Sequence, residues 1–142
     1  MNVTPFKSEH FLDLDLQAAQ RYARKEVTMS MLMELEMNES YTILDGSQPI
    51  ACVGLVPIWY NRAYVWTALS CEMKFSFLKV HRICNELLDT ANLMWHRIEC
   101  YVNCDHMPGH RWAKLTGFKL ETPKAEAFMP NGDDVSVYVR IR

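Results

Sequence analysis

The chain contains 142 residues, of which 49% are hydrophobic, and its formal net charge is -2. This length is enough for one domain with a hydrophobic core and too short for two, so we expect a single domain over residues 1–142. The lack of an overall basic charge argues against general nucleic-acid binding. No apolar run approaches the roughly 18 residues that a membrane span needs, and the N-terminus has no signal-peptide pattern. We therefore expect a cytoplasmic protein without a membrane span.

Five cysteines are present, an odd number without a C-x-x-C spacing. Four of them lie within apolar patterns, as reduced core thiols do: Cys52, Cys71, Cys84 and Cys100. The loop that follows the last of these contains Cys104, His106 and His110, which are zinc-ligand residue types. Their spacing matches no common zinc pattern. The sequence therefore predicts a reducing compartment and no metal site.

The first forty residues predict a short strand and two helices. Residues 3–7 are rich in β-formers, and Ser8 is a plausible N-cap for a helix whose apolar residues recur at helical spacing between Phe11 and Tyr22. Residues 28–37 are strong helix formers. Because the methionines of this second helix spread around more than one face, we expect at least one of them to be exposed or to lie in an interface.

Three antiparallel strands are predicted next, over residues 41–44, 50–56 and 63–71. The turn between the first two contains Asp45-Gly46, and glycine accepts the positive φ that such a turn needs. We expect Pro57 to end or bulge the second strand, since proline cannot donate a hydrogen bond to a ladder.

The second half of the chain begins with the longest predicted helix, residues 75–94, followed by an alternating strand at 96–102. A short helix over residues 108–116 has Pro108 in its first turn and Gly117 just after its end. Two strands, 125–129 and 134–142, close the chain around the turn "PNGD".

This order of elements resembles the GNAT (Gcn5-related N-acetyltransferase) superfamily, whose members use acetyl-coenzyme A, and the resemblance covers essentially the whole chain. The stretch "RWAKLTGFKLE" is similar to the last helix and following strand of that family, with Gly117 ending the helix and Phe118 starting the strand. The resemblance implies an α+β fold with a mixed sheet of six to seven strands and about four helices, in which only the fourth and fifth strands are parallel. The length and the glycine-poor centre are also similar to small GNAT-like proteins of short-tailed bacteriophages, including internal virion proteins.

The resemblance implies that acetyl-CoA binds beside the fourth strand and the start of the long helix. Family members bind the pyrophosphate there with a glycine-rich loop, but the equivalent stretch here, "SCEMKFSFLKVHR", contains no glycine. Phe75 and Phe77 replace small residues, and Glu72 adds negative charge. The candidate cofactor-binding residues are the backbone of the fourth strand's end, two lysines and one asparagine: Leu69, Ser70, Cys71, Lys74, Lys79 and Asn103.

The catalytic residues of the family are only partly present. The tyrosine that protonates the departing thiolate in many members is replaced by Ala113, four residues before Gly117. A general base is expected to be Glu72 or Glu99, and a solvent-facing carboxylate is the alternative for each.

The resemblance, weighed against these residues, implies two possible functions. The first is a GNAT-fold protein with a degenerate acyl-CoA site that is non-catalytic or weakly active, comes from a bacteriophage, and binds a virion or host protein. The alternative is an acetyl-CoA-dependent N-acetyltransferase that acts on an amine of a small molecule or protein. Under the first reading, at least one ring of Phe75 and Phe77 lies in or beside the anion site and narrows it.

Overall fold

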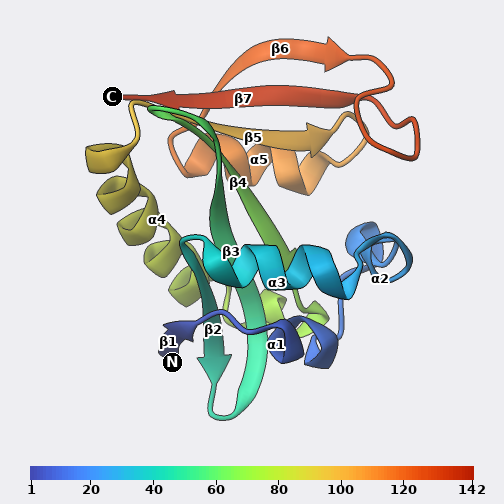
Figure 1. Ribbon diagram of the computed structural model, residues 1–142, viewed down its shortest axis with the longest axis vertical. Helices are drawn as coiled ribbons and strands as arrows, with labels where there is room; N and C mark the ends of the chain where they lie inside the picture. The colour runs from blue at the N-terminus through green and yellow to red at the C-terminus, as the bar shows by residue number, and fades with distance from the viewer. The chain divides into compact units, whose positions relative to one another are not determined.

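The computed structural model describes residues 1–142 and contains seven β-strands, five α-helices and two short 3-10 helices (Figure 1). The strands are Asn2–Pro5 (β1), Ser40–Asp45 (β2), Gln48–Trp59 (β3), Arg62–Leu69 (β4), Arg97–Asn103 (β5), Lys119–Ala125 (β6) and Val135–Ile141 (β7). The helices are Ser8–Asp13 (α1), Ala23–Glu26 (α2), Met29–Met37 (α3), Phe77–Met94 (α4) and Met107–Leu115 (α5), with 3-10 turns at Ala18–Gln20 (η1) and Cys71–Phe75 (η2).

The strands form one mixed sheet with the order β1-β2-β3-β4-β5-β7-β6. β4 pairs with β5 in parallel, with Ala63 opposite Ile98, whereas the pairs β1–β2, β2–β3, β5–β7 and β6–β7 are antiparallel. The predicted α+β class and the predicted parallel pairing of the fourth and fifth strands are confirmed.

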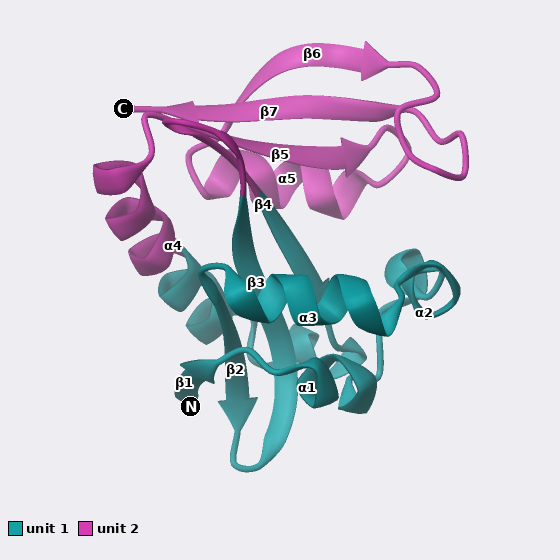
Figure 2. Cartoon of the chain, in the orientation of Figure 1, with its two compact units in different colours: residues 1–56, 65–84 teal, residues 57–64, 85–142 magenta.

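The chain divides into two compact units, shown in different colours in Figure 2. Unit 1 comprises residues 1–56 and 65–84, and unit 2 comprises residues 57–64 and 85–142. Unit 1 contains the helices α1 to α3 and the strands β1 and β2, and unit 2 contains α5 and the strands β5 to β7. β3, β4 and α4 each contribute residues to both units.

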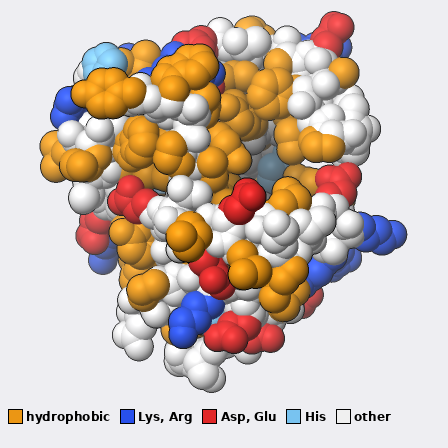
Figure 3. All heavy atoms as spheres, in the orientation of Figure 1, with side chains coloured by type: hydrophobic (Ala, Val, Ile, Leu, Met, Phe, Trp, Pro, Cys, Tyr) orange, Lys and Arg blue, Asp and Glu red, His pale blue; other side chains and the backbone are white.

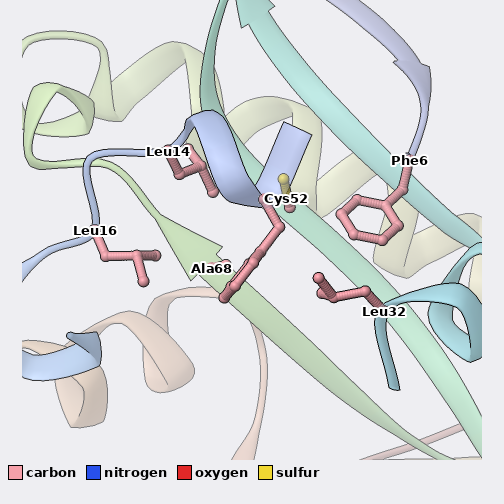
Figure 4. Close-up of a cluster of buried hydrophobic side chains, with 7 residues drawn as sticks. Phe6, Leu14, Leu16, Leu32, Cys52 and Ala68 are labelled. Carbon is pink, nitrogen blue, oxygen red and sulfur yellow. The ribbon is translucent and has the colours of Figure 1, made fainter. Parts of the chain in front are cut away.

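The core of unit 1 is a cluster of buried side chains contributed by the N-terminal segments, α3, β3 and β4. Its members are Phe6, Phe11, Leu14, Leu16, Leu32, Cys52 and Ala68, most of which are labelled in Figure 4. The ring of Phe6 also meets the ring of Trp66 edge to face, with 5.3 Å between the centroids. Burial raises the pKa of Cys52 to about 11, despite a hydrogen bond with Thr42 that lowers it, so this thiol stays protonated.

The core of unit 2 lies on the paired strands β5, β7 and β6. Val135, Val137 and Val139 are buried there, and Tyr101, Ala125 and Met129 pack against them. Gly117 ends α5 with φ of 84°, and Phe118 after it is buried and donates its amide to Ala113 O over 3.0 Å. This is the helix ending expected from the sequence, because glycine alone takes positive φ without steric cost.

The prediction of a long helix that includes Phe11 to Tyr22 is wrong. α1 ends at Asp13, and the chain then becomes extended, with Leu14 and Leu16 buried and Asp15 exposed between them. The backbone of Leu16 bridges to Ser70 after β4, and Asp15 O accepts the amide of Cys71 over 2.8 Å. Pairing with a distant segment therefore replaces the local helix.

Two strand boundaries also differ from the prediction. β3 does not end at Pro57 but continues to Trp59; Pro57 lies beyond the end of β2, so its missing N–H costs no hydrogen bond of the β2–β3 ladder. The strand expected at 125–129 lies earlier, at Lys119–Ala125. Ala127 has φ of 48°, and the amides of Phe128 and Met129 both donate to Asp133 O, so this segment is a turn.

Helix α3 begins after Thr28, whose side chain accepts the amide of Met31 over 3.2 Å. Only Leu32 of this helix is buried. Its four methionines, Met29, Met31, Met33 and Met37, are exposed, as the sequence predicts for at least one of them. Hydrophobic side chains reach the surface at several other places as well (Figure 3). No helix is long and apolar enough to span a membrane.

Candidate functional site

The three backbone amides at the end of β4 all have partners within unit 1. The amide of Leu69 donates to Gln20 Oε1 over 2.7 Å, that of Ser70 to Ile50 O over 2.9 Å, and that of Cys71 to Asp15 O over 2.8 Å. Two of these acceptors are backbone carbonyls held by paired segments, whereas the acceptor for Leu69 is a side chain. Leu69 is therefore the residue whose amide a ligand can reach by displacing one side chain.

The connection between β4 and α4 is a 3-10 turn, which needs no glycine. Ser70 caps it, since its side chain accepts the amide of Glu72 over 3.1 Å, and Met73 anchors it by being buried. Glu72 is exposed and makes no ion pair. Helix α4 then starts at Phe77, with Ser76 O accepting the amides of both Lys79 and Val80 over 3.0 Å.

The two phenylalanines of this connection lie outside the core. Phe75 is 76% exposed, and Lys74 Nζ lies 4.9 Å from the centroid of its ring. Phe77 is half-buried and stacks on His81, with 5.7 Å between the ring centroids. Lys79, the third residue of α4, is exposed. The 3-10 turn and the start of α4 together thus present two lysines and two aromatic rings instead of the glycines of a phosphate loop.

Glu99, the second carboxylate considered from the sequence, lies on β5 in unit 2 and is almost completely buried. Arg62 binds it through both Nε and Nη2, Arg97 Nε donates to it over 3.1 Å, and Tyr101 Oη donates to Oε1 over 3.2 Å. Burial acts to raise the pKa of Glu99, but the hydrogen bonds from the two arginines outweigh it, and the pKa is lowered. A carboxylate held this way is a poor proton acceptor, so its geometry favours a structural role.

Asn103, at the end of β5, has both ends of its side chain occupied. Its Nδ2 donates to Asp133 Oδ2 over 3.0 Å, and its Oδ1 accepts the amide of Asp105 over 3.1 Å. The backbone carbonyl of Asn103 also accepts the amide of His106. These bonds form the turn that leads into α5, so the side chain positions the chain itself.

The His-rich loop of unit 2 is organised by one histidine. His110 Nε2 lies 3.0 Å from Cys104 O and therefore donates to it, which leaves Nδ1 to accept the phenol proton of Tyr138 over 2.7 Å. Cys104 Sγ contacts Ser136 Oγ and Pro123 O, both at 3.8 Å. Burial lowers the pKa of His106, and the nearby His110 lowers it further. The loop is tied to β7 through these contacts.

The structure brings Leu69, Ser70, Cys71, Glu72, Lys74 and Lys79 together along one short segment of unit 1, whereas Glu99 and Asn103 belong to unit 2. Sequence reasoning missed Gln20, which contacts this segment. Nothing in its neighbourhood in the sequence distinguishes it from other surface glutamines, because its contact depends on a residue 49 positions away.

No protein family matches the sequence, and no curated protein matches it either. Solved structures do match in their fold. The acetyltransferase (GNAT family) from Bacillus anthracis has a TM-score of 0.74 with 12% identity, and the match covers 98% of this chain and 93% of that one. Ard1 from Thermoplasma volcanium has a TM-score of 0.79 with 11% identity, covering 99% and 96% of the two chains.

A chimera of the spermidine N-acetyltransferase SpeG from Vibrio cholerae and hSSAT has a TM-score of 0.75 with 15% identity, covering 99% of this chain and 96% of the chimera. None of these three is described as a phage or virion protein, so the relationship to bacteriophage proteins stays a prediction. All three matches extend over nearly the full length of both chains, although the sequence identities are only 11–15%. The chain therefore has the GNAT acetyltransferase fold.

Proposed function

We propose that this protein is an acyl-CoA-dependent N-acyltransferase, the alternative function considered from the sequence. The fold supports this proposal, since it matches N-acetyltransferases along the whole chain. Fold alone does not determine activity, so an active enzyme also needs suitable groups at the end of β4 and the start of α4.

The observation that carries the proposal is the Leu69 amide and the helix start that follows it. Leu69 N–H donates to a movable side chain, so it is available to a substrate carbonyl once Gln20 withdraws. Helix α4 begins eight residues later and is 18 residues long, so its N-terminus favours an anion such as a phosphate. Lys74 and Lys79 add positive charge at this end.

The transfer itself needs a deprotonated amine. Its nitrogen attacks the thioester carbonyl carbon, the new C–N bond forms, the C–S bond breaks, and the thiolate leaves while the amine proton passes to a base. Between the two carboxylates considered from the sequence, Glu72 is the better base, because it is exposed and free of arginine partners whereas Glu99 is bound by two. We assign Glu72 this role.

Calorimetry with acetyl-CoA, followed by an acetylation assay, tests the proposal. We expect micromolar binding and acetyl transfer to at least one member of a panel of polyamines and peptides with free N-terminal amines. A protein that shows no binding at millimolar acetyl-CoA contradicts the proposal.

A second candidate function is the non-catalytic GNAT-fold protein that binds a protein partner. The glycine-free turn and the exposed ring of Phe75 favour it, because a phenylalanine beside the helix start takes space that a glycine leaves open. Replacing Phe75 with Gly, Phe77 with Ala and Glu72 with Gln tests it. If the wild type binds no acetyl-CoA and the triple variant does, the second function replaces the first.

A further inference from the structure

The side chain of Gln20 closes a backbone edge of β4. Its Nε2 donates to Thr67 O over 2.9 Å, and its Oε1 accepts the amide of Leu69 over 2.7 Å. Ser70 N donates to Ile50 O in β3, and backbone groups alternate in direction along a strand. The groups of Thr67 and Leu69 therefore point to the edge of β4 opposite β3.

The two hydrogen bonds of the Gln20 side chain have the same pattern as those made by a residue of a neighbouring strand. A residue of a paired strand offers one N–H and one C=O on the same side, and the primary amide of glutamine offers the same pair of groups. Next to Gln20, backbone groups pair with this edge of β4: Gln17 N donates to Leu69 O over 2.9 Å, and Leu16 bridges to Ser70. Gln20 thus fills a position on this edge that an extended amide-containing chain can also fill.

This contact is the easiest part of the edge to open. Leu16 is buried in the core of unit 1, so the backbone pairing at Leu16 and Gln17 is anchored by packing. Gln20 ends the 3-10 turn η1, and no residue of that turn is buried. A rotation of the half-buried Gln20 side chain therefore frees Thr67 O and Leu69 N without moving any fully buried residue of the turn. Ordering such a long side chain costs up to about 2 kcal/mol, which offsets part of what its two bonds contribute.

We propose that Gln20 is a displaceable occupant of the acyl-donor site, and that an acyl-thioester substrate carrying amide groups binds by taking its place. The inference rests on the proposed function. A substrate carbonyl oxygen replaces Oε1 as the acceptor for Leu69 N–H, and a substrate N–H replaces Nε2 as the donor to Thr67 O. Binding then exchanges two hydrogen bonds for two others, so the affinity of the wild type is reduced by the need to remove Gln20.

Nuclear magnetic resonance of the wild-type protein reads the displacement directly. On saturation with acetyl-CoA, the side-chain NH2 signals of Gln20 should move to the position of a solvent-exposed glutamine. The Leu69 amide should remain protected from hydrogen exchange, because a new acceptor replaces the old one. Unchanged Gln20 side-chain signals in the saturated complex overturn the inference, even if the protein is an active acyltransferase.

Affinity gives an independent test. The Gln20→Ala variant should bind acetyl-CoA about tenfold more tightly than the wild type, the amount expected when about 1.4 kcal/mol of competing hydrogen bonding is removed. Gln17→Ala is the matched control with unchanged affinity, because Gln17 pairs with Leu69 through its backbone amide, and the side-chain bonds to Thr67 and Leu69 come from Gln20. Gln20→Met is a second variant of similar length, and its side chain can neither accept from Leu69 N–H nor donate to Thr67 O, so it should also bind more tightly.

The outcomes separate the two proposals. Binding with displacement of Gln20 but without acyl transfer to any amine removes the proposed function and keeps the inference. Binding by Gln20→Ala alone supports the inference in its strongest form, in which Gln20 blocks the site. An affinity of Gln20→Ala equal to or weaker than that of the wild type overturns the inference, as does the absence of binding in both proteins.

Discussion

Glu99 is a buried carboxylate on β5 that ion pairs and a tyrosine hydrogen bond stabilise. Its carboxylate is 3% exposed and carries hydrogen bonds from two arginines and one tyrosine. Glu99→Gln keeps the shape but leaves one acceptor oxygen, so Arg62 and Arg97 lose part of their partner. We expect a loss of about 1–3 kcal/mol in the free energy of unfolding, measured by urea denaturation. This loss is smaller than the loss expected for a fully buried ion pair, because both arginine side chains remain partly exposed.

The same residue gives a pH dependence with a defined sign. The pKa of Glu99 is lowered from 4.5 in the folded protein, so its contribution to stability is complete above that value and is lost as the pH falls through the folded pKa. The difference in unfolding free energy between the wild type and Glu99→Gln should therefore be constant near neutral pH and shrink in acid. A difference that grows as the pH falls would be inconsistent with a carboxylate stabilised by arginines.

Glu72 carries the catalytic prediction. If it accepts the amine proton, Glu72→Gln should lower kcat/KM about 100-fold at neutral pH, the lower end of what a general base contributes. The acetyl-CoA affinity should not weaken, because the change removes a negative charge near the helix start. Glu26→Gln is the matched control, since Glu26 is also exposed and belongs to unit 1. The activity of both variants is measured by steady-state kinetics at saturating acetyl-CoA. Full activity in Glu72→Gln as well as in Glu26→Gln would refute the role of Glu72 as the base.

At the scale of an element, α5 depends on the glycine that ends it. Gly117 has φ of 84°, and a Cβ added there would lie 3.4 Å from Arg140 Nε. Gly117→Ala should therefore cost about 1–2 kcal/mol of stability from backbone strain. Gly132→Ala is the matched control, with φ of 85° and open space around the added Cβ, so it measures the strain alone. A urea midpoint unchanged in Gly117→Ala would contradict this account.

Elements whose signals are local were predictable from the sequence. The Pro108 and Gly117 pair marks α5 within about one residue at each end, and Gly46 with φ of 62° forms the expected turn between β2 and β3. The segment after Asp13 was not predictable, because its apolar spacing also suits a helix. Its extended form depends on pairing with residues 69–71, which are more than fifty positions away. Local propensity was overridden there by tertiary pairing.

The position of the candidate site was predictable from the sequence, whereas the contacts of its residues were not. The resemblance pointed to the segment from Leu69 to Lys79, and the structure places these residues consecutively at the end of β4 and the start of α4. That the amides of Leu69, Ser70 and Cys71 are already hydrogen-bonded was not predictable, since each acceptor comes from a distant part of the chain. The arginine partners of Glu99 were equally hidden, because Arg62 lies 37 residues before it.

Three elements, β3, β4 and α4, contribute residues to both compact units. The boundaries between the units fall inside β3, β4 and α4, after residues 56, 64 and 84. Unfolding of one unit alone would require β3, β4 and α4 to lose their structure over only part of their length. This is unfavourable, because the hydrogen bonds of such an element are lost cooperatively. The two units are therefore expected to unfold together. The single domain expected from the chain length stays a prediction.

Tryptophan fluorescence can test this cooperativity unit by unit. Of the four tryptophans, Trp66 lies in unit 1, whereas Trp59, Trp95 and Trp112 lie in unit 2. A variant with Trp59, Trp95 and Trp112 replaced by Phe reports on unit 1 through Trp66, and Trp66→Phe reports on unit 2. In urea, each fluorescence transition should coincide with the circular dichroism transition of the same variant, because all three signals follow one cooperative event. Separate midpoints for fluorescence and circular dichroism within one variant would show that the units unfold independently and that the chain folds as two domains.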